Sequence, residues 1–196
     1  EQKPLEFNYL TIEDKNPELY EAYMQSIRDY HATEHQVLIA RFDNKAGAPS
    51  GRADHITCLP DSVDYVVLNN YKELNDVMYN EAKEIREKKA IPTLLLLDYA
   101  VLNKEYAAYL ESLPVEEPEV APAEEGEVED TPQEVLDPEA MRNAWFAEKA
   151  AAFVDVVKKY EMDGIMLSYT GKVVLSLKEN EMAAVKAFQE AFFAPL

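Results

Sequence analysis

Short apolar runs alternate with longer amphipathic segments along the chain. Four runs closed by turn residues have the length of strands, and they span 37–40, 63–68, 91–97 and 164–167. Helical spacing of apolar positions marks the segments between them, at about 16–30, up to about 89, at 138–160 and from about 179 onward. Apolar strands that alternate with helices indicate parallel βαβ units whose strands are buried on both faces. We therefore expect an α/β fold.

The chain's negative charge is concentrated in one segment. The net charge is −19, and residues 112–139 hold eleven acidic side chains but no Lys or Arg. Four prolines interrupt residues 112–137, and like charges repel, so we expect a disordered insertion at about 112–137. Ca²⁺ binding is the rival interpretation, but the spacing of the carboxylates matches no calcium loop. A strongly negative chain is also a poor partner for nucleic acid or an anionic membrane surface, and we expect neither.

Composition sets further bounds. Apolar residues make up 47% of the 196 residues, which is enough for a sizeable core, and no apolar run approaches the roughly 20 residues that span a bilayer. The single Cys58 excludes an internal disulfide, and nothing nearby marks it as reactive. The chain starts at Glu1 without Met, from which we expect a processed or engineered N-terminus, with any targeting segment already removed.

Histidines and glycines suggest no cofactor chemistry. The three histidines are expected at a helix end (His31), in a linker (His35) and in a loop (His55), without metal-ligand spacing. We expect surface histidines and no metal. The chain has five glycines and neither a G-x-G-x-x-G nor a P-loop motif, so no nucleotide cofactor is expected.

Three segments carry a resemblance to a known family. They read HQVLIARFD at 35–43, LPDSVDYVVL at 59–68 and KYEMDGIMLSYT at 159–170. In this order they resemble the first, second and fourth barrel strands of family 18 glycoside hydrolases, in particular the endo-β-N-acetylglucosaminidase-like branch of gut Bacteroidetes. The 59–68 segment is the most specific match. The resemblance implies a parallel (β/α) TIM-type barrel, of which about four βα units are present.

A barrel of this type needs about 250 residues and eight units. Half a barrel would expose strand edges and an apolar face, which favour association. The rest of the barrel belongs to a longer polypeptide, another chain supplies it, or the units form an open sheet. We expect a homo-oligomer or a C-terminal half to complete it. Residues 1–34 are expected to form an N-terminal arm and helix, and 35–196 the barrel-like domain.

The resemblance also bears on catalysis. The family's active-site pattern is D-x-x-D-x-D-x-E, in which the Glu protonates the glycosidic oxygen and the preceding Asp orients the substrate's own N-acetyl group. The corresponding positions here are Asp163, Met166, Ser168 and Thr170. Threonine has no usable proton near neutral pH, and the loss of a positioned acid alone costs about 10²- to 10⁴-fold in rate. We therefore expect no ordinary family 18 hydrolysis and no catalytic residues.

A binding surface can outlast lost catalysis. In barrels, ligands meet the carboxyl ends of the strands. The predicted ligand-binding residues at these ends are Phe42, Asp43, Asn69, Asn70, Asp98, Tyr99, Ser168, Tyr169 and Thr170. Aromatic faces stack on sugar C–H faces, and amides or carboxylates pair with hydroxyls. For each residue, ending a strand or filling the barrel mouth is the alternative role.

The sequence therefore favours a non-catalytic glycan-binding protein that takes a ligand containing N-acetylglucosamine. The resemblance implies an extracytoplasmic place, in the periplasm or on the outer-membrane surface, with lipoprotein attachment as one option. A glycoside hydrolase that uses other carboxylates, such as Asp43 or Asp98, is one alternative. A structural or interaction module with a relict barrel is another.

Overall fold

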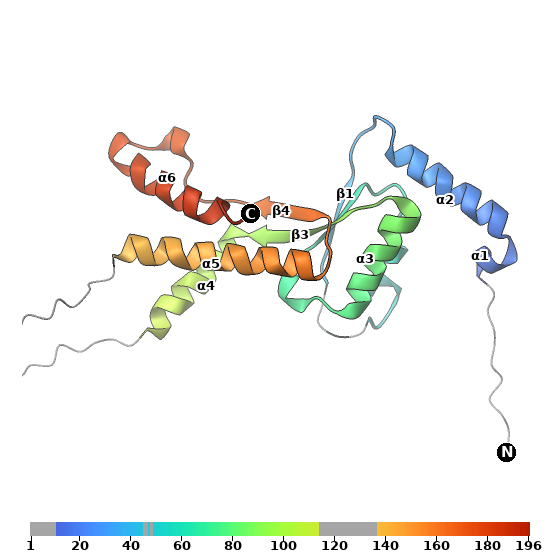
Figure 1. Cartoon of the computed structure of the whole chain (residues 1–196), viewed down its shortest axis with the longest axis horizontal. Coiled ribbons are helices and arrows are strands. Elements are labelled where there is room, and N and C mark those ends of the chain that lie inside the picture. Colours follow the sequence, from blue (N-terminus) through green and yellow to red (C-terminus); the bar gives the residue numbers. More distant parts are fainter. Residues whose placement is uncertain (1–10, 45–46, 48, 114–136) are drawn as a thin grey trace, which may run out of the picture. The chain divides into compact units, whose positions relative to one another are not determined.

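The computed structural model describes residues 11–44, 47, 49–113 and 137–196 (Figure 1). Two compact units make up the chain. The first is drawn from residues 1–97 and 157–166, and the second from 98–156 and 167–196. The start of the expected N-terminal arm and nearly all of the expected acidic insertion lie outside the described residues.

A four-stranded sheet holds the parallel units. Its strands are β1 (Ile39–Phe42), β2 (Tyr65–Leu68), β3 (Thr93–Asp98) and β4 (Gly164–Ser168), in the spatial order β1-β2-β3-β4. Ile39 pairs with Tyr65 and Val66 with Thr93, both in parallel register. The predicted α/β class and the four βα-type strands are confirmed.

Burial separates the central strands from the edge. Val67, Leu68 and Leu95, on β2 and β3, are fully buried. At the first strand Leu38 is 50% exposed and Ile39 46%, so the expectation that this apolar run is buried on both faces is wrong. β1 ends the strand order and pairs only with β2, which leaves its other side without a neighbouring strand among the described residues.

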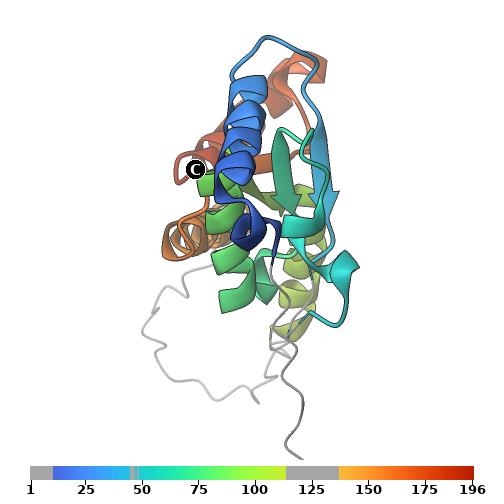
Figure 2. The same cartoon turned by 90° about the vertical axis from the view of Figure 1, so that its right-hand side faces the viewer.

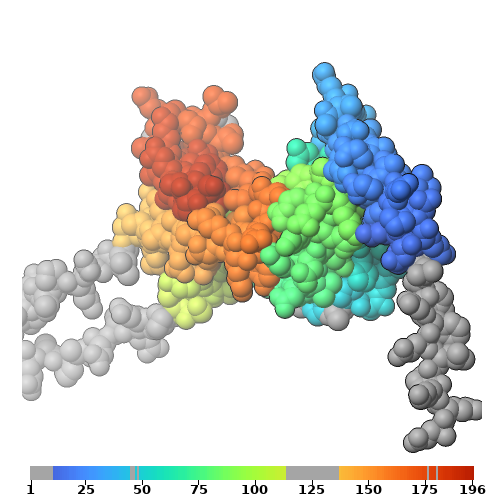
Figure 3. Space-filling view, turned by 45° about the vertical axis from the view of Figure 1, so that its right-hand side comes forward, coloured from blue at the N-terminus to red at the C-terminus, as the bar shows by residue number. Residues whose placement is uncertain are grey.

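Three helices belong wholly to the first unit: α1 (Ile12–Lys15), α2 (Pro17–His31) and α3 (Asp76–Lys89). α2 begins as its sequence predicts, because the Asn16 side chain accepts a hydrogen bond from Leu19 N (3.1 Å). α2 lies beside α3 (Figures 2 and 3), and the Arg28 guanidinium donates to the carbonyl of Lys88 at 2.9 Å. Their buried side chains close the core beside the central strands: Met24, Ile27, Met78, Ala82 and Ile85.

Two turns that lead from a helix into a strand use a left-handed residue. Ala90, directly after α3, has a φ of 58°, and Glu161, before β4, has a φ of 48°. Before β4, Glu161 N bonds to Lys158 O and Met162 N to Val157 O, which is the Schellman pattern, whereas after α3 Ala90 N bonds to Arg86 O and Ile91 N to Ile85 O. Neither position is a glycine, the residue that adopts this conformation without steric cost.

The second unit is built from α4 (Tyr99–Ser112), α6 (Glu179–Phe193) and most of α5 (Pro138–Lys159). α4 was not anticipated: the acidic segment was expected to connect the third strand directly to the 138–160 helix. Asp98, the last residue of β3, caps α4 by accepting a hydrogen bond from Ala100 N at 2.8 Å. None of the described helices is both long and apolar enough to cross a membrane.

Aromatic rings form the core of the second unit. Phe146 of α5 is fully buried, and its ring lies 5.1 Å from Phe188 and 5.7 Å from Phe192, centroid to centroid. Tyr99 stacks on Phe146 at 5.6 Å. Four short 3₁₀ turns complete the described elements: η1 (Arg52–Asp54), η2 (Ile56–Cys58), η3 (Tyr71–Glu73) and η4 (Val174–Ser176).

Candidate functional site

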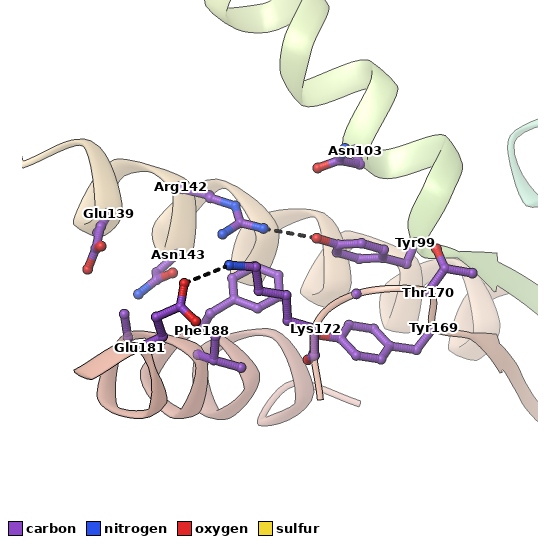
Figure 4. Close-up of a pocket in the computed structure, with 13 residues that line it drawn as sticks. Tyr99, Asn103, Glu139, Arg142, Asn143, Tyr169, Thr170, Lys172, Glu181 and Phe188 are labelled. Atoms are coloured by element: carbon purple, nitrogen blue, oxygen red, sulfur yellow. Dashed lines mark hydrogen bonds and ion pairs between the residues drawn. The ribbon is translucent and has the colours of Figure 1, made fainter. Parts of the chain in front are cut away.

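A cavity of about 600 Å³ lies in the second unit, next to the residues that follow β3 and β4 (Figure 4). Three of the sequence-predicted ligand residues line it: Tyr99, Tyr169 and Thr170. Asp98 and Ser168, the last residues of the two strands, are not among its lining residues. The remaining wall comes from α4, α5, α6 and the segment after Thr170.

Two tyrosine rings form one side of the cavity. The centroids of Tyr99 and Tyr169 lie 4.9 Å apart, with their planes inclined by 56°. Tyr169 Oη donates to the carbonyl of Lys172 at 3.1 Å, which fixes the far end of this ring. A side chain at Gly171 would collide with the Tyr169 ring, so the glycine is needed for this close approach. The cavity therefore has a preformed aromatic wall.

Arg142 brings a positive charge to the same site. Its Nη2 donates to the hydroxyl of Tyr99 at 2.9 Å, and its guanidinium carbon lies 4.3 Å from the ring centroid of Phe188. Within the described part of the chain, no carboxylate forms an ion pair with Arg142. Lys172, the other lining cation, pairs with Glu181 at 3.4 Å. Arg142 is thus held in place while most of its N–H groups stay available.

Amides and a second carboxylate complete the polar lining. Asn103 of α4 and Asn143 and Glu139 of α5 line the cavity. Within residues 11–113 and 137–196, as far as these are described, the two amide side chains make no hydrogen bond to the protein. They can therefore donate to and accept from a ligand hydroxyl group.

Sequence reasoning missed most of these residues because it did not anticipate α4 and read the 138–160 helix for its apolar face only. The polar stretch 139–143 at the start of α5 was the available signal. No sequence feature singled out the residues that α6 contributes, Glu181 and Phe188.

Three of the four motif positions lie on or just after the fourth strand. Met166 lies within β4, Ser168 ends it and Thr170 follows two residues later. Thr170 lines the cavity, whereas Met166 and Ser168 do not. Asp163, before the strand, accepts hydrogen bonds from Arg86 Nη1 and Thr93 N, each at 2.8 Å. Both carboxylate oxygens of Asp163 are thus occupied in the first unit.

The remaining predicted ligand residues belong to the first unit, where they tie β1 to β2. Asn70 Nδ2 donates to Asp43 Oδ1 at 3.1 Å and to the carbonyl of Asn44 at 2.7 Å. Asn69 Oδ1 accepts from Arg41 Nε at 3.1 Å. Phe42 is the last, half-buried residue of β1. Asn44, which follows Asp43, is almost fully buried and exchanges two further bonds with Asn70.

A second polar cluster lies in the first unit, at the amino ends of β1 and β2. Asp64 Oδ1 lies 3.0 Å from His31 Nδ1 and 2.6 Å from His35 Nε2. The expectation of surface histidines is wrong for His31, whose side chain is only 7% exposed. The fold brings the helix end, the linker and the second strand together, a convergence that sequence spacing does not reveal. His55 instead pairs with Glu81.

Hydrogen bonds shift the pKa values in this cluster. Burial alone raises the pKa of Asp64, but bonds from Leu38 N, His35 and His31 outweigh it and lower the pKa to about 2. The bond to Asp64 raises the pKa of His35, and the carbonyl of Thr33 adds to this shift. Both ring nitrogens of His35 thus face acceptors, the carbonyl of Thr33 and the carboxylate of Asp64.

Comparisons with known proteins agree with the fold. A family model described as glycoside hydrolase family 18, BT1044-like, matches residues 2–196. A solved structure named "BT1044SeMet E190Q", whose numbering is its own, is 20% identical with a TM-score of 0.51. The alignment covers 96% of this chain and 55% of that one, so this chain spans about half the length of its structural neighbour. The comparison with curated proteins produced no match.

Proposed function

Because the chain belongs to glycoside hydrolase family 18, in its BT1044-like group, we propose that it is a non-catalytic glycan-binding protein. One observation carries the proposal: the cavity beside the ends of β3 and β4 has an aromatic wall and uncommitted amides, with Thr170 in its lining. Ligands of parallel barrels bind at this end of the strands.

The lining suits a sugar ring. The C–H face of a pyranose stacks on an aromatic ring such as Tyr169. Its hydroxyl groups both donate and accept, as do the amides of Asn103 and Asn143, while Arg142 offers further donors. A glycan that contains N-acetylglucosamine is the proposed ligand class, because hydrolysis in this family depends on the substrate's own N-acetyl group.

Binding without cleavage follows from the fourth strand. A family 18 hydrolase needs an acid after this strand to protonate the leaving oxygen, and Thr170 occupies that position. Met166 and Ser168 occupy the two preceding acidic positions. Loss of the general acid lowers the rate by about 10²- to 10⁴-fold, and loss of the acetamide-orienting Asp removes the partner of the nucleophile.

Binding is tested by titrating chitooligosaccharides and N-glycans into the intact chain in a calorimeter. We expect saturable binding that Tyr169→Ala weakens by about five- to tenfold, since the variant removes the stacking face. Tyr109→Ala is the matched control, because Tyr109 also lies in the second unit and packs on Trp145 but does not line the cavity. No binding at millimolar ligand would contradict the proposal and favour a structural or interaction module.

Hydrolysis by other carboxylates is the second candidate, because Glu139 and Glu181 both line the cavity. Asp43 and Asp98 are weaker candidates, since Asp43 bonds to Asn70 and Asp98 caps α4. Turnover of a chromogenic N-acetylglucosaminide that disappears in Glu181→Gln but persists in Asp98→Asn would establish an enzyme. Turnover lost only in Asp98→Asn would identify Asp98 as the catalytic carboxylate.

The proposal extends to the setting of the protein. An extracytoplasmic site, in the periplasm or at the outer-membrane surface, suits a protein that captures glycans for uptake. We also propose that a second copy or further polypeptide pairs with the open edge of β1, where Val37 and Leu38 are at least half exposed. Light scattering after size exclusion tests this, and a cooperatively unfolding monomer would contradict it.

A further inference from the structure

Three potential metal ligands converge in the first unit, away from the residues that carry the proposed function. His31 is the last residue of α2, His35 lies between α2 and β1, and Asp64 immediately precedes β2. One donor atom from each side chain lies within 4.8 Å of the other two. The side chains of His31 and Asp64 are 7% and 8% exposed, and that of His35 is 17% exposed.

We propose that this cluster binds Zn²⁺ through His31 Nδ1, His35 Nε2 and Asp64 Oδ1. Two imidazole nitrogens and one carboxylate oxygen form a donor set that zinc prefers. Ligands about 2.0–2.1 Å from a tetrahedral zinc lie about 3.3 Å from one another. The two nitrogens lie 3.0 and 2.6 Å from the shared oxygen, so small side-chain shifts admit the ion.

The groups around the cluster already orient its ligands. His35 Nδ1 donates to the carbonyl of Thr33 at 2.8 Å, which leaves Nε2 as the nitrogen that can present a lone pair. Leu38 N donates to Asp64 Oδ2 at 2.6 Å, which leaves Oδ1 for the ion. Backbone partners of this kind are typical of metal-bound histidines and carboxylates. Zinc would take the place of the protons that the two rings now direct at Asp64.

The ring of His31 commits only its proposed ligand atom, Nδ1, to a partner. Its Nε2 is buried without a hydrogen-bond partner among the described residues. Tyr30 covers both rings, with centroids 5.2 Å from His31 and 4.4 Å from His35. The ring of His31 is therefore held rigidly beside Asp64 at the cost of one unpaired nitrogen.

His55 shows what an ordinary histidine–carboxylate pair looks like in this chain. The side chain of His55 pairs with the carboxylate of Glu81 and is 35% exposed. No third ligand group accompanies this pair among the described residues. The contrast makes His55 the matched control for the cluster.

A bound zinc would act as a clamp. It would join the end of α2 and the adjoining linker to the start of β2, since Asp64 lies 33 residues after His31 and 29 after His35. The partly exposed side of His35 leaves room for water as a fourth ligand. Because the folded chain would assemble the site, metal binding would stabilise the fold.

The test uses the intact chain, stripped of metal with a chelator that is then removed by dialysis. Zinc titration is expected to give one tight site per chain, and a hundredfold excess over Kd to raise Tm by about 5 °C or more. Co²⁺ is expected to give the visible absorption of a four-coordinate ion. His31→Gln and His35→Gln should each weaken binding at least tenfold, and His55→Gln should leave it unchanged.

Two separate cluster variants, His31→Gln and His35→Gln, are used so that misfolding of one does not decide the test. Circular dichroism verifies that each is folded. The proposal is wrong if folded wild type binds no zinc at about 100 μM, since the cluster is then only a hydrogen-bond network. It is also wrong if both cluster variants keep the affinity of the wild type, because the metal then binds elsewhere, for instance to exposed carboxylates. Glycan binding is measured separately, so either proposal can fail alone.

Discussion

The two units of the chain use their polar side chains in opposite ways. In the first, the carboxylates of Asp64, Asp163 and Glu81 each accept a hydrogen bond from a backbone N–H group of another segment. In the second, Asn103 and Asn143 line a cavity and bond to no other side chain or backbone group that the structure describes. Side chains that are hydrogen-bonded within the protein stabilise the fold, whereas cavity side chains without such bonds can bind a ligand.

The two units also differ in the kind of contact that stabilises them. The second unit relies on aromatic rings packed around Phe146. The first relies on charged side chains that form hydrogen bonds with residues at the strand ends. This difference separates substitutions that damage folding from those that damage binding. The four experiments below test it in order of decreasing effect.

Phe146→Ala is expected to have the largest effect. The side chain is fully buried against Tyr99, Phe188 and Phe192, so its loss leaves a cavity and lowers the free energy of unfolding by about 3–5 kcal/mol. Urea denaturation followed by circular dichroism measures it. The control is Phe193→Ala, whose side chain is more than a third exposed. Equal losses in both variants would mean that the rings do not form the framework of the second unit.

Asp64→Ala removes a carboxylate of the first unit that accepts three hydrogen bonds. Leu38 N would lose a charged acceptor and His31 and His35 their shared partner, so we expect a loss of about 2–3 kcal/mol in unfolding free energy. The exposed Asp155 provides the control, since Asp155→Ala should change stability by less than about 0.5 kcal/mol. A loss below about 1 kcal/mol from Asp64→Ala would show that its bonds add little.

Gly171→Ala sharpens the contrast between binding and folding. The added methyl group displaces the ring of Tyr169 from the cavity wall, while the core rings stay in place. We expect glycan affinity to fall about three- to tenfold, with the free energy of unfolding within about 1 kcal/mol of wild type. Paired calorimetric titration and urea denaturation measure the two quantities. An unchanged affinity would remove Tyr169 from the ligand contacts.

The smallest effect is expected from Asp61 in the first unit, as a function of pH. Burial alone raises its pKa, but bonds from Lys89 and Tyr23 outweigh it and hold the pKa below its ordinary 3.8. The bond to Asp61 in turn raises the pKa of Tyr23 above 10.0. A lowered acid pKa gives stability above pH ~4 that is lost on acidification, and a raised tyrosine pKa gives stability that is lost above pH ~10.

Wild type should therefore exceed Asp61→Asn by less than about 1 kcal/mol between these limits, because the pair is partly exposed. The difference should shrink as the pH leaves this window in either direction. Thermal denaturation of both proteins at pH 3, 7 and 11 measures it. A difference that is constant over this range would mean that neither group titrates differently in the folded chain.

Much of the architecture could be predicted from sequence because strands and helices have different apolar periods. The capping of α2 by Asn16 and the run 91–97 are local features, and local features survive folding. The family assignment from LPDSVDYVVL at 59–68 is confirmed by the family model. The predicted burial of the first strand was wrong because a sequence does not reveal which strand lies at the edge of the sheet.

The candidate site was less predictable because its residues come from separate helices. Tyr99, Tyr169 and Thr170 follow strands, so topology alone places them at the cavity. Arg142 lies 43 residues from its partner Tyr99, and no local pattern connects them. The His31–Asp64 contact has the same origin, since only the fold brings the last residue of α2 to the residue before β2.

The left-handed turn at Ala90 is a position where a substitution can stabilise the fold. A side chain at φ 58° crowds its own backbone, and a glycine there would relieve the crowding without altering the hydrogen bonds of Ala90 N and Ile91 N, which involve only main-chain atoms. The turn contributes no residue to the cavity wall or to the histidine cluster. A more robust variant for glycan capture or for crystallography can therefore start from this one position.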